Sequence, residues 1–210
     1  MKMKRILAII LVLAPLQMTA ATSRGSHQEE GSQNIPQHQI MISSNLLSWA
    51  ALGTLNLRTD YSIGSHWSLT ASANWNPWTF GSGSDRQFQA RQLSPALGAR
   101  WWQKHPYKGL YTGAEALWSI YNIALPKIDG SPVIDGRSAE GMCAGGAIIC
   151  GYTIPLGEGR WTLSLGGSWW GGWRSDTIYE KARCGRKLET REGFSQGLRE
   201  ITVSIGYKIH

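Results

Sequence analysis

The sequence predicts an all-β protein, namely an eight-stranded, antiparallel, up-and-down transmembrane β-barrel. Three observations predict this fold class. Apolar and polar residues alternate along many segments, short and long connections between the segments alternate, and tryptophan and tyrosine residues gather near the segment ends. A strand with lipid on one side and a polar interior on the other shows this period of two. No apolar run reaches the roughly 20 residues of a membrane-spanning helix, so a helical membrane protein is excluded.

The first 21 residues are expected to form a signal peptide. Three cations among the first five residues precede an apolar run over 6–16, and small residues follow it up to Ala21. The run is too short to span a bilayer, which is typical of a cleaved export signal. Residues 22–38 are rich in Ser, Gln, Gly and Glu and lack periodicity, so we expect a flexible periplasmic arm. The barrel would then cover residues 39–210.

Strict alternation predicts the strands. In the segment 161–169, Trp161, Leu163 and Leu165 share one face, while threonine, serine and glycine occupy the other. An even number of strands places both ends of the chain in the periplasm. The first and sixth strands alternate least cleanly. The eight predicted strands cover residues 39–51, 53–63, 67–77, 91–102, 109–122, 140–154, 161–173 and 196–208.

The lengths of the connections orient the predicted barrel. Connections after the second, fourth and sixth strands are short, whereas those after the third, fifth and seventh strands are long and cover 78–90, 123–139 and 174–195. Outer-membrane barrels have short periplasmic turns and long external loops. Only the short connection near Leu52, after the first strand, departs from this pattern.

Aromatic residues predict where the membrane boundaries lie. Trp67 and Trp75 bound one strand, and Trp161 and Trp169 bound another. Eight residues at about 3.3 Å each, tilted near 40°, rise roughly 20 Å, close to the apolar band of such barrels. In a soluble barrel that binds a small apolar ligand, the alternative fold, these tryptophans would instead lie in the core. The predicted interface aromatics are Trp67, Trp75, Trp101, Trp118, Trp161, Trp169 and Tyr207.

The polar faces of the strands would point into a narrow interior. Arg58 and Asp60 on the second strand, Arg100 on the fourth and Glu115 on the fifth would share it. Buried charges need partners, and an eight-stranded interior is filled by side chains. We expect an interior salt-bridge network that plugs the barrel; a proton or ion path is the alternative.

Charge and residue types argue against several functions. The net charge of +7 includes three cations in the expected signal, and no Lys/Arg stripe suggests nucleic-acid binding. No histidine falls at the predicted outer rim, and no Gly-x-Ser-x-Gly motif occurs, so we expect no catalytic residues. Cys143 and Cys150 lie in one strand, too far apart for a disulfide, and Cys184 has no neighbouring metal ligand. No cofactor or metal site is therefore expected.

One stretch of sequence resembles a known family. Trp67-Ser-Leu is followed by Asn74-Trp-Asn-Pro-Trp-Thr-Phe, in which Asn74, Asn76, Pro77 and Trp78 form the most specific part. Over about 40–208 the chain is similar to the small, uncharacterised outer-membrane barrel proteins of Bacteroidales, a domain of unknown function. Many members carry Cys-x-x-Cys-Gly in the last long loop. Here Lys181 stands at the first cysteine position before Cys184, so no loop-stapling disulfide or metal site is expected.

The expected function is structural, adhesive or in surface assembly, without catalysis, in the outer membrane of a Gram-negative bacterium. The resemblance implies that the gene lies near fimbrial assembly genes, as in some relatives, so a fimbrial or surface-assembly protein is one expected partner. Cations of loop 174–195 could pair with lipopolysaccharide or could simply be solvated. Outer-membrane lipid is a further expected partner, and nucleic acid is not. An enzyme that modifies outer-leaflet lipid is the alternative from another class.

Overall fold

The computed structural model describes residues 38–50, 53–80, 88–124, 137–157, 160–180 and 185–209. All of them belong to one compact unit, Ile35–His210. The predicted signal peptide and nearly all of the predicted arm lie outside the described residues. The elements, in order, are β1 (Ile40–Asn45), α1 (Leu46–Ala50), β2 (Leu55–Ser62), β3 (Trp67–Asn76), β4 (Thr79–Phe80), β5 (Phe88–Trp102), β6 (Gly109–Ala124), β7 (Ser138–Pro155), β8 (Trp161–Tyr179) and β9 (Lys187–Ile209).

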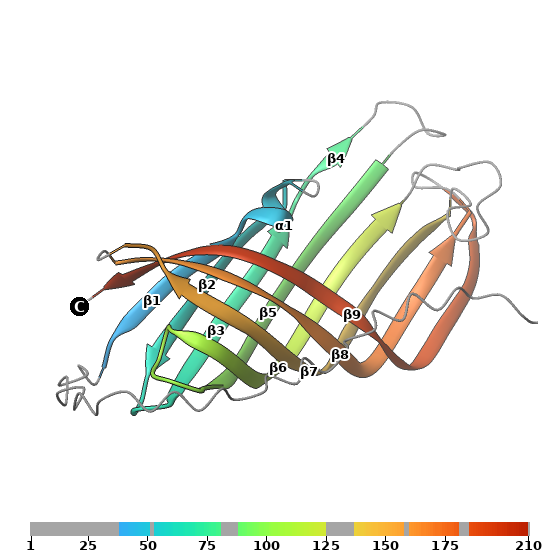
Figure 1. Ribbon diagram of the computed structural model, residues 1–210. Coiled ribbons are helices and arrows are strands. Elements are labelled where there is room, and N and C mark those ends of the chain that lie inside the picture. The colour runs from blue at the N-terminus through green and yellow to red at the C-terminus, as the bar shows by residue number, and fades with distance from the viewer. Residues whose placement is uncertain are drawn as a thin grey trace, which may run out of the picture. The chain divides into compact units, whose positions relative to one another are not determined.

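All strands belong to one antiparallel sheet in which neighbours in sequence are neighbours in space. The order is β3-β2-β1-β9-β8-β7-β6-β5-β4, and β3 also pairs with β5, which closes the sheet into a ring (Figure 1). The two-residue β4 continues β3 along β5, so eight strands form the wall. The predicted all-β, antiparallel, up-and-down ring is confirmed.

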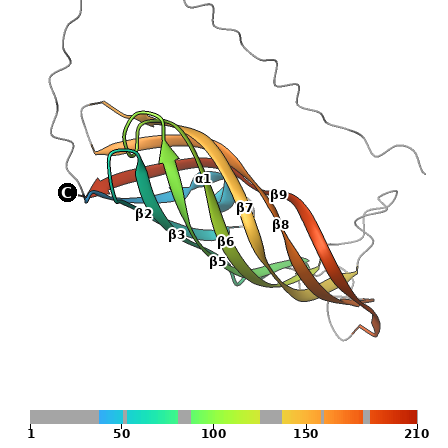
Figure 2. The ribbon, with the colours of Figure 1, turned by 90° about the horizontal axis from the view of Figure 1, so that it is seen from below.

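The strands are longer at the predicted external end than the sequence predicts. They lengthen from 6 residues in β1 to 23 in β9, and β7, β8 and β9 bend along their length (Figure 2). The prediction of a loop over 174–195 is wrong, because β8 continues to Tyr179 and β9 begins at Lys187. Loops 78–90 and 123–139 are shortened in the same way. Apolar alternation stops before these strands end, because the backbone hydrogen bonds between two strands continue where both faces are polar.

The predicted first strand, 39–51, is also wrong in its second half. It ends at Asn45 and continues as α1. The reason is local, because the Asn56 side chain takes the place of the next pair of backbone hydrogen bonds between β1 and β2. Its amide oxygen accepts from Asn45 N at 2.5 Å, and its Nδ2 donates to Asn45 O at 2.9 Å. β1 is therefore too short to cover its neighbour β9.

Asn45 compensates for part of this shortfall. Only residues 204–209 of β9 pair with β1, so within the described chain residues 187–203 pair with β8 alone. The buried Asn45 side chain donates to Ile201 O at 2.9 Å and accepts from Val203 N at 3.0 Å. One side chain thus satisfies two backbone groups at the point where the strand partner stops.

We expect Asn45→Ala to lower the unfolding free energy by about 2–3 kcal/mol. Each lost hydrogen bond contributes about 1 kcal/mol and leaves a β9 backbone group without a hydrogen-bond partner. Denaturant unfolding in detergent measures the effect. Asn122→Ala is the matched control, because its strand is paired on both sides; its cost should stay below about 1 kcal/mol. Equal costs at the two positions would contradict the capping role.

The two faces of the ring have opposite polarity. Thr153 and Thr162 point inward and are fully buried, whereas Leu97 and Ile148 point outward and are 67% and 69% exposed. The polar faces of the predicted strands therefore line the interior, and the apolar faces cover the outside. Among the described residues, no helix is long and apolar enough to cross a membrane.

Candidate functional site

Six charged side chains meet in the middle of the ring. We call Arg58, Asp60, Arg100, Glu115, Arg199 and Glu200 the ionic cluster. The structure brings the four sequence-predicted residues together and adds Arg199 and Glu200 from β9. Arg100 lies 3.5 Å from Asp60 and 3.8 Å from Glu115, and Arg58 lies 3.9 Å from both Glu115 and Glu200. Arg199 donates to Glu115 Oε2 at 2.5 Å, so Glu115 contacts all three arginines.

Glycines on neighbouring strands make room for these side chains. Gly98 stands opposite Glu115, and Gly113 stands opposite Arg100. A Cβ at Gly98 would lie 2.8 Å from Glu115 Cγ, and one at Gly113 would lie 3.1 Å from Arg100 Cγ. Each long charged side chain therefore lies across a glycine of the next strand, and this arrangement fixes its direction into the interior.

Attraction between full charges, rather than a complete set of hydrogen bonds, holds the cluster. Several of its buried polar atoms have no hydrogen-bond partner among the described residues: Arg58 Nε, both carboxylate oxygens of Asp60, Arg100 Nε, Glu115 Oε1 and Arg199 Nη2. Three cations balance three anions. In such a buried cluster, removing one charge leaves an opposite charge without compensation.

Aromatic side chains close the end of the ring at which β1 begins and β9 ends. Trp102 packs against Tyr107 and Tyr111 with ring centroids 5.6 and 5.0 Å apart, and Met41 completes this buried group. Trp102 Nε1 donates to Ser68 Oγ at 2.9 Å. The Arg100 guanidinium lies 5.0 Å above the Tyr111 ring. We call Met41, Trp102, Tyr107 and Tyr111 the aromatic floor. It contacts the ionic cluster through Arg100, so the two groups together fill the interior near this end of the ring.

Tyr107 reaches the floor from the turn between β5 and β6. Its hydroxyl donates to Gln39 O at 2.8 Å and to Asp60 O at 2.9 Å, and its backbone has a φ of 71°. Burial, followed by the negative charge of Asp60, raises the pKa of the Tyr107 phenol well above its ordinary value. The phenol therefore stays protonated in the folded protein at pH values where it ionises in the unfolded chain.

This raised pKa predicts a loss of stability at alkaline pH. The stabilisation is complete below the phenol's ordinary pKa of about 10 and decreases above it, by up to about 1.4 kcal/mol per pH unit for one proton. Tyr107→Phe should therefore be less stable at neutral pH but lose about 1–2 kcal/mol less than the wild type between pH 10 and 12. Urea unfolding at several pH values tests this. Parallel pH profiles for the two proteins would contradict it.

Two further layers lie above the ionic cluster. Ala96, Leu117 and Ala147 form a small apolar layer with the partly buried Cys143 and Trp170. Beyond it, the Tyr121 hydroxyl donates to Asp176, which also pairs with Arg174. The described interior thus alternates between apolar and polar layers of side chains.

The predicted interface aromatics lie on the outside of the ring. The six tryptophans are exposed, with Trp101 the least and Trp169 the most exposed, and Tyr207 is half-buried because its ring packs 5.0 Å from that of Trp161. Trp67 stands opposite Trp101, and Trp75 stands opposite Leu93. The aromatic residues therefore border the apolar outer face at both ends.

The Asn-x-Asn-Pro-Trp motif forms hydrogen bonds with the residues just before β2. Buried Asn76 donates to Thr54 Oγ1 at 2.9 Å and accepts from Trp78 N at 3.1 Å. The Trp78 indole donates to Gly53 O at 2.9 Å. Gly53 has a φ of 63°, and a Cβ there would lie 3.3 Å from Trp78 Nε1. Asn74 stands opposite Asn56, while Pro77 borders a groove on the outer face. The motif has a structural role at the top of β2 and β3.

A family model described as "Protein of unknown function (DUF3575)" matches residues 9–209. The chain belongs to this family. The match extends over every described strand of this DUF3575 protein, including the Asn-x-Asn-Pro-Trp motif. A comparison with curated proteins found no match.

The described cysteines and histidines of this DUF3575 protein do not form a common site. Cys143 and Cys150 are free thiols, and in the described part of the chain no cluster of His, Cys, Asp and Glu could hold a metal ion. His38 contacts the Tyr61 hydroxyl, and His66 contacts Trp102 O; both lie near the closed end. Cys184, His27 and His210 lie outside the described residues.

Sequence reasoning missed several interior residues. Trp102 follows Arg100 by two positions, so the period of two could have placed it inside. Glu200 likewise shares the face of Thr202. Arg199 could not be found in this way, because it is the extra residue of a bulge in β9, where Glu200 stands opposite Ser168 and Leu198 stands opposite Trp169. Tyr107 belongs to a turn, where alternation gives no signal.

Proposed function

We propose that this protein is an outer-membrane β-barrel of a Gram-negative bacterium, closed by its own side chains, with a structural or adhesive role at the cell surface. The inverted polarity of the ring carries this proposal. Large apolar side chains such as Leu97, Ile148 and Leu165 are exposed on the outside, while Arg100 and Glu115 are buried inside. A soluble protein rarely exposes so continuous an apolar surface, whereas lipid favours it.

The filled interior supports a role other than transport. The aromatic floor and the ionic cluster occupy the section that a solute would have to cross. Such a barrel offers its external end for contacts with a surface-assembly partner, such as a fimbrial protein, and with lipopolysaccharide. The extended β8–β9 hairpin is the largest described part of that end. Its Arg174 and Arg191 already have acidic partners, Asp176 and Glu189.

Membrane fractionation combined with heat-modifiable gel mobility tests the proposal. The folded protein should sediment with outer membranes, resist extraction by salt, dissolve in detergent and migrate differently before and after boiling. A protein that stays in the periplasmic supernatant and shows no mobility shift would overturn the proposal and favour a soluble barrel. Deletion of residues 180–186 should leave both properties intact while reducing surface adhesion or assembly.

A further inference from the structure

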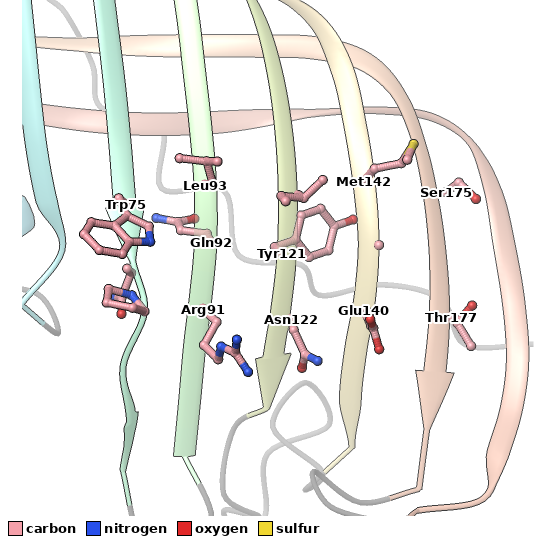
Figure 3. Close-up of a pocket in the computed structure, with 14 residues that line it drawn as sticks. Trp75, Arg91, Gln92, Leu93, Tyr121, Asn122, Glu140, Met142, Ser175 and Thr177 are labelled. Atoms are coloured by element: carbon pink, nitrogen blue, oxygen red, sulfur yellow. The ribbon is translucent and has the colours of Figure 1, made fainter.

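A groove with a volume of about 840 Å³ lies on the outer face of the ring, across β3, β5, β6, β7 and β8 (Figure 3). Most of its residues alternate with the interior ones along each strand, so their side chains point outward, whereas Gln92 and Tyr121 border it from interior-facing positions. Cross-strand register arranges them in two rows. Trp75, Leu93, Ile120 and Met142 form the apolar row, and Arg91, Asn122, Glu140 and Thr177 form the polar row, which lies nearer the external end.

The outward-facing positions above the polar row are buried. Gln89, Ala124 and Ser138 come next on the same outward face, yet they are only 4%, 1% and 4% exposed. The polar row below them is accessible, with Arg91 and Glu140 both exposed. The accessible, amphipathic surface of the groove therefore ends at the polar row.

Arg91 and Glu140 are the two charged groups among the described residues of the groove, and they do not pair with each other. Asn122 separates them on the intervening strand, which places their backbones roughly 10 Å apart at about 4.8 Å per strand. Neither forms an ion pair or hydrogen bond with another described residue. Asn122 and Thr177 add polar side chains between and beside them, and Asn122 is already oriented by its contact with Gln89.

This pattern matches one class of head group. A guanidinium recognises a phosphate through charge-assisted hydrogen bonds, and a carboxylate recognises an ammonium group. The apolar row beneath would receive an acyl chain running along the lipid-facing wall. From this complementarity we propose that the groove binds a lipid whose head group carries phosphoethanolamine, with the phosphate at Arg91 and the amine at Glu140. The inference builds on the proposed membrane location.

Lipid capture by the purified full-length protein in detergent tests this site, with bound lipid read out by native mass spectrometry. The probes are phosphatidylethanolamine, phosphatidylglycerol, phosphatidylcholine and soluble phosphoethanolamine. The wild type should retain phosphatidylethanolamine about tenfold better than the other two lipids. Arg91→Gln should reduce capture of phosphatidylethanolamine and phosphatidylglycerol alike, whereas Glu140→Gln should remove only the preference for phosphatidylethanolamine. Arg160→Gln, a change of the same kind at the opposite end, should leave the capture unchanged.

Three results would overturn the inference: equal capture of all three lipids, no effect of Arg91→Gln, or capture of soluble phosphoethanolamine as strong as that of the lipid. Fractionation and heat modifiability of the same proteins keep the two proposals apart. A membrane-embedded protein without lipid preference would contradict only the groove assignment. A protein found in the soluble fraction would contradict the membrane location itself.

Discussion

Glu115→Gln is expected to destabilise the folded protein by about 3–5 kcal/mol, the usual cost of breaking a buried charge cluster. The carboxylate is 3% exposed and contacts Arg58, Arg100 and Arg199. The substitution keeps the shape of the side chain but leaves three cations facing two anions. Denaturant unfolding of the refolded protein in detergent measures the loss.

Two further variants make this result specific to the cluster. Glu189→Gln changes the same residue type in an exposed pair with Arg191, so its cost should stay below about 1 kcal/mol. Combining Glu115→Gln with Arg199→Gln should recover part of the lost stability, because the partner charge left uncompensated is removed as well. If the two costs simply add, the cluster is not coupled and the interior description is wrong. The double variant also keeps the test open if Glu115→Gln alone fails to fold.

Ile148→Arg is expected to have the second largest effect. Ile148 lies midway along β7, points outward and is 69% exposed, beside Ala114 and Trp169 on the neighbouring strands. In water, a cation at so exposed a site would change stability by about 0.5 kcal/mol or less. At the middle of a bilayer it costs about 2–4 kcal/mol. The variant should therefore insert poorly into lipid vesicles and unfold more easily from them.

Leu188→Arg provides the control for this experiment. Leu188 is also exposed but lies at the external end of β9, where the proposed barrel has left the lipid. Its substitution should leave insertion and stability unchanged. Equal, small effects at positions 148 and 188 would indicate that the outer face meets water, and the soluble barrel would then be the better description.

The period of two determined much of this protein by itself. It predicted the all-β ring and assigned Arg58, Asp60, Arg100 and Glu115 to the polar face, because side chains on a strand alternate between its faces. It also separated outward Trp67 and Trp75 from the polar residues between them. A face assignment needs only the strand's own sequence, so these features could be predicted without any neighbouring strand.

Tertiary structure decided everything that depends on register between strands. Alternation does not say which residues of two strands stand opposite each other, so it could not bring Arg199 within 2.5 Å of Glu115, 84 residues away in the chain. It could not end β1 at Asn45 either, because the stop depends on hydrogen bonds to Asn56 and to β9. The same holds for the groove, in which Arg91 and Glu140 become neighbours only through the pairing of β5, β6 and β7. Turn geometry and the burial of one face of each strand set that pairing, so the sequence of a single strand does not determine it.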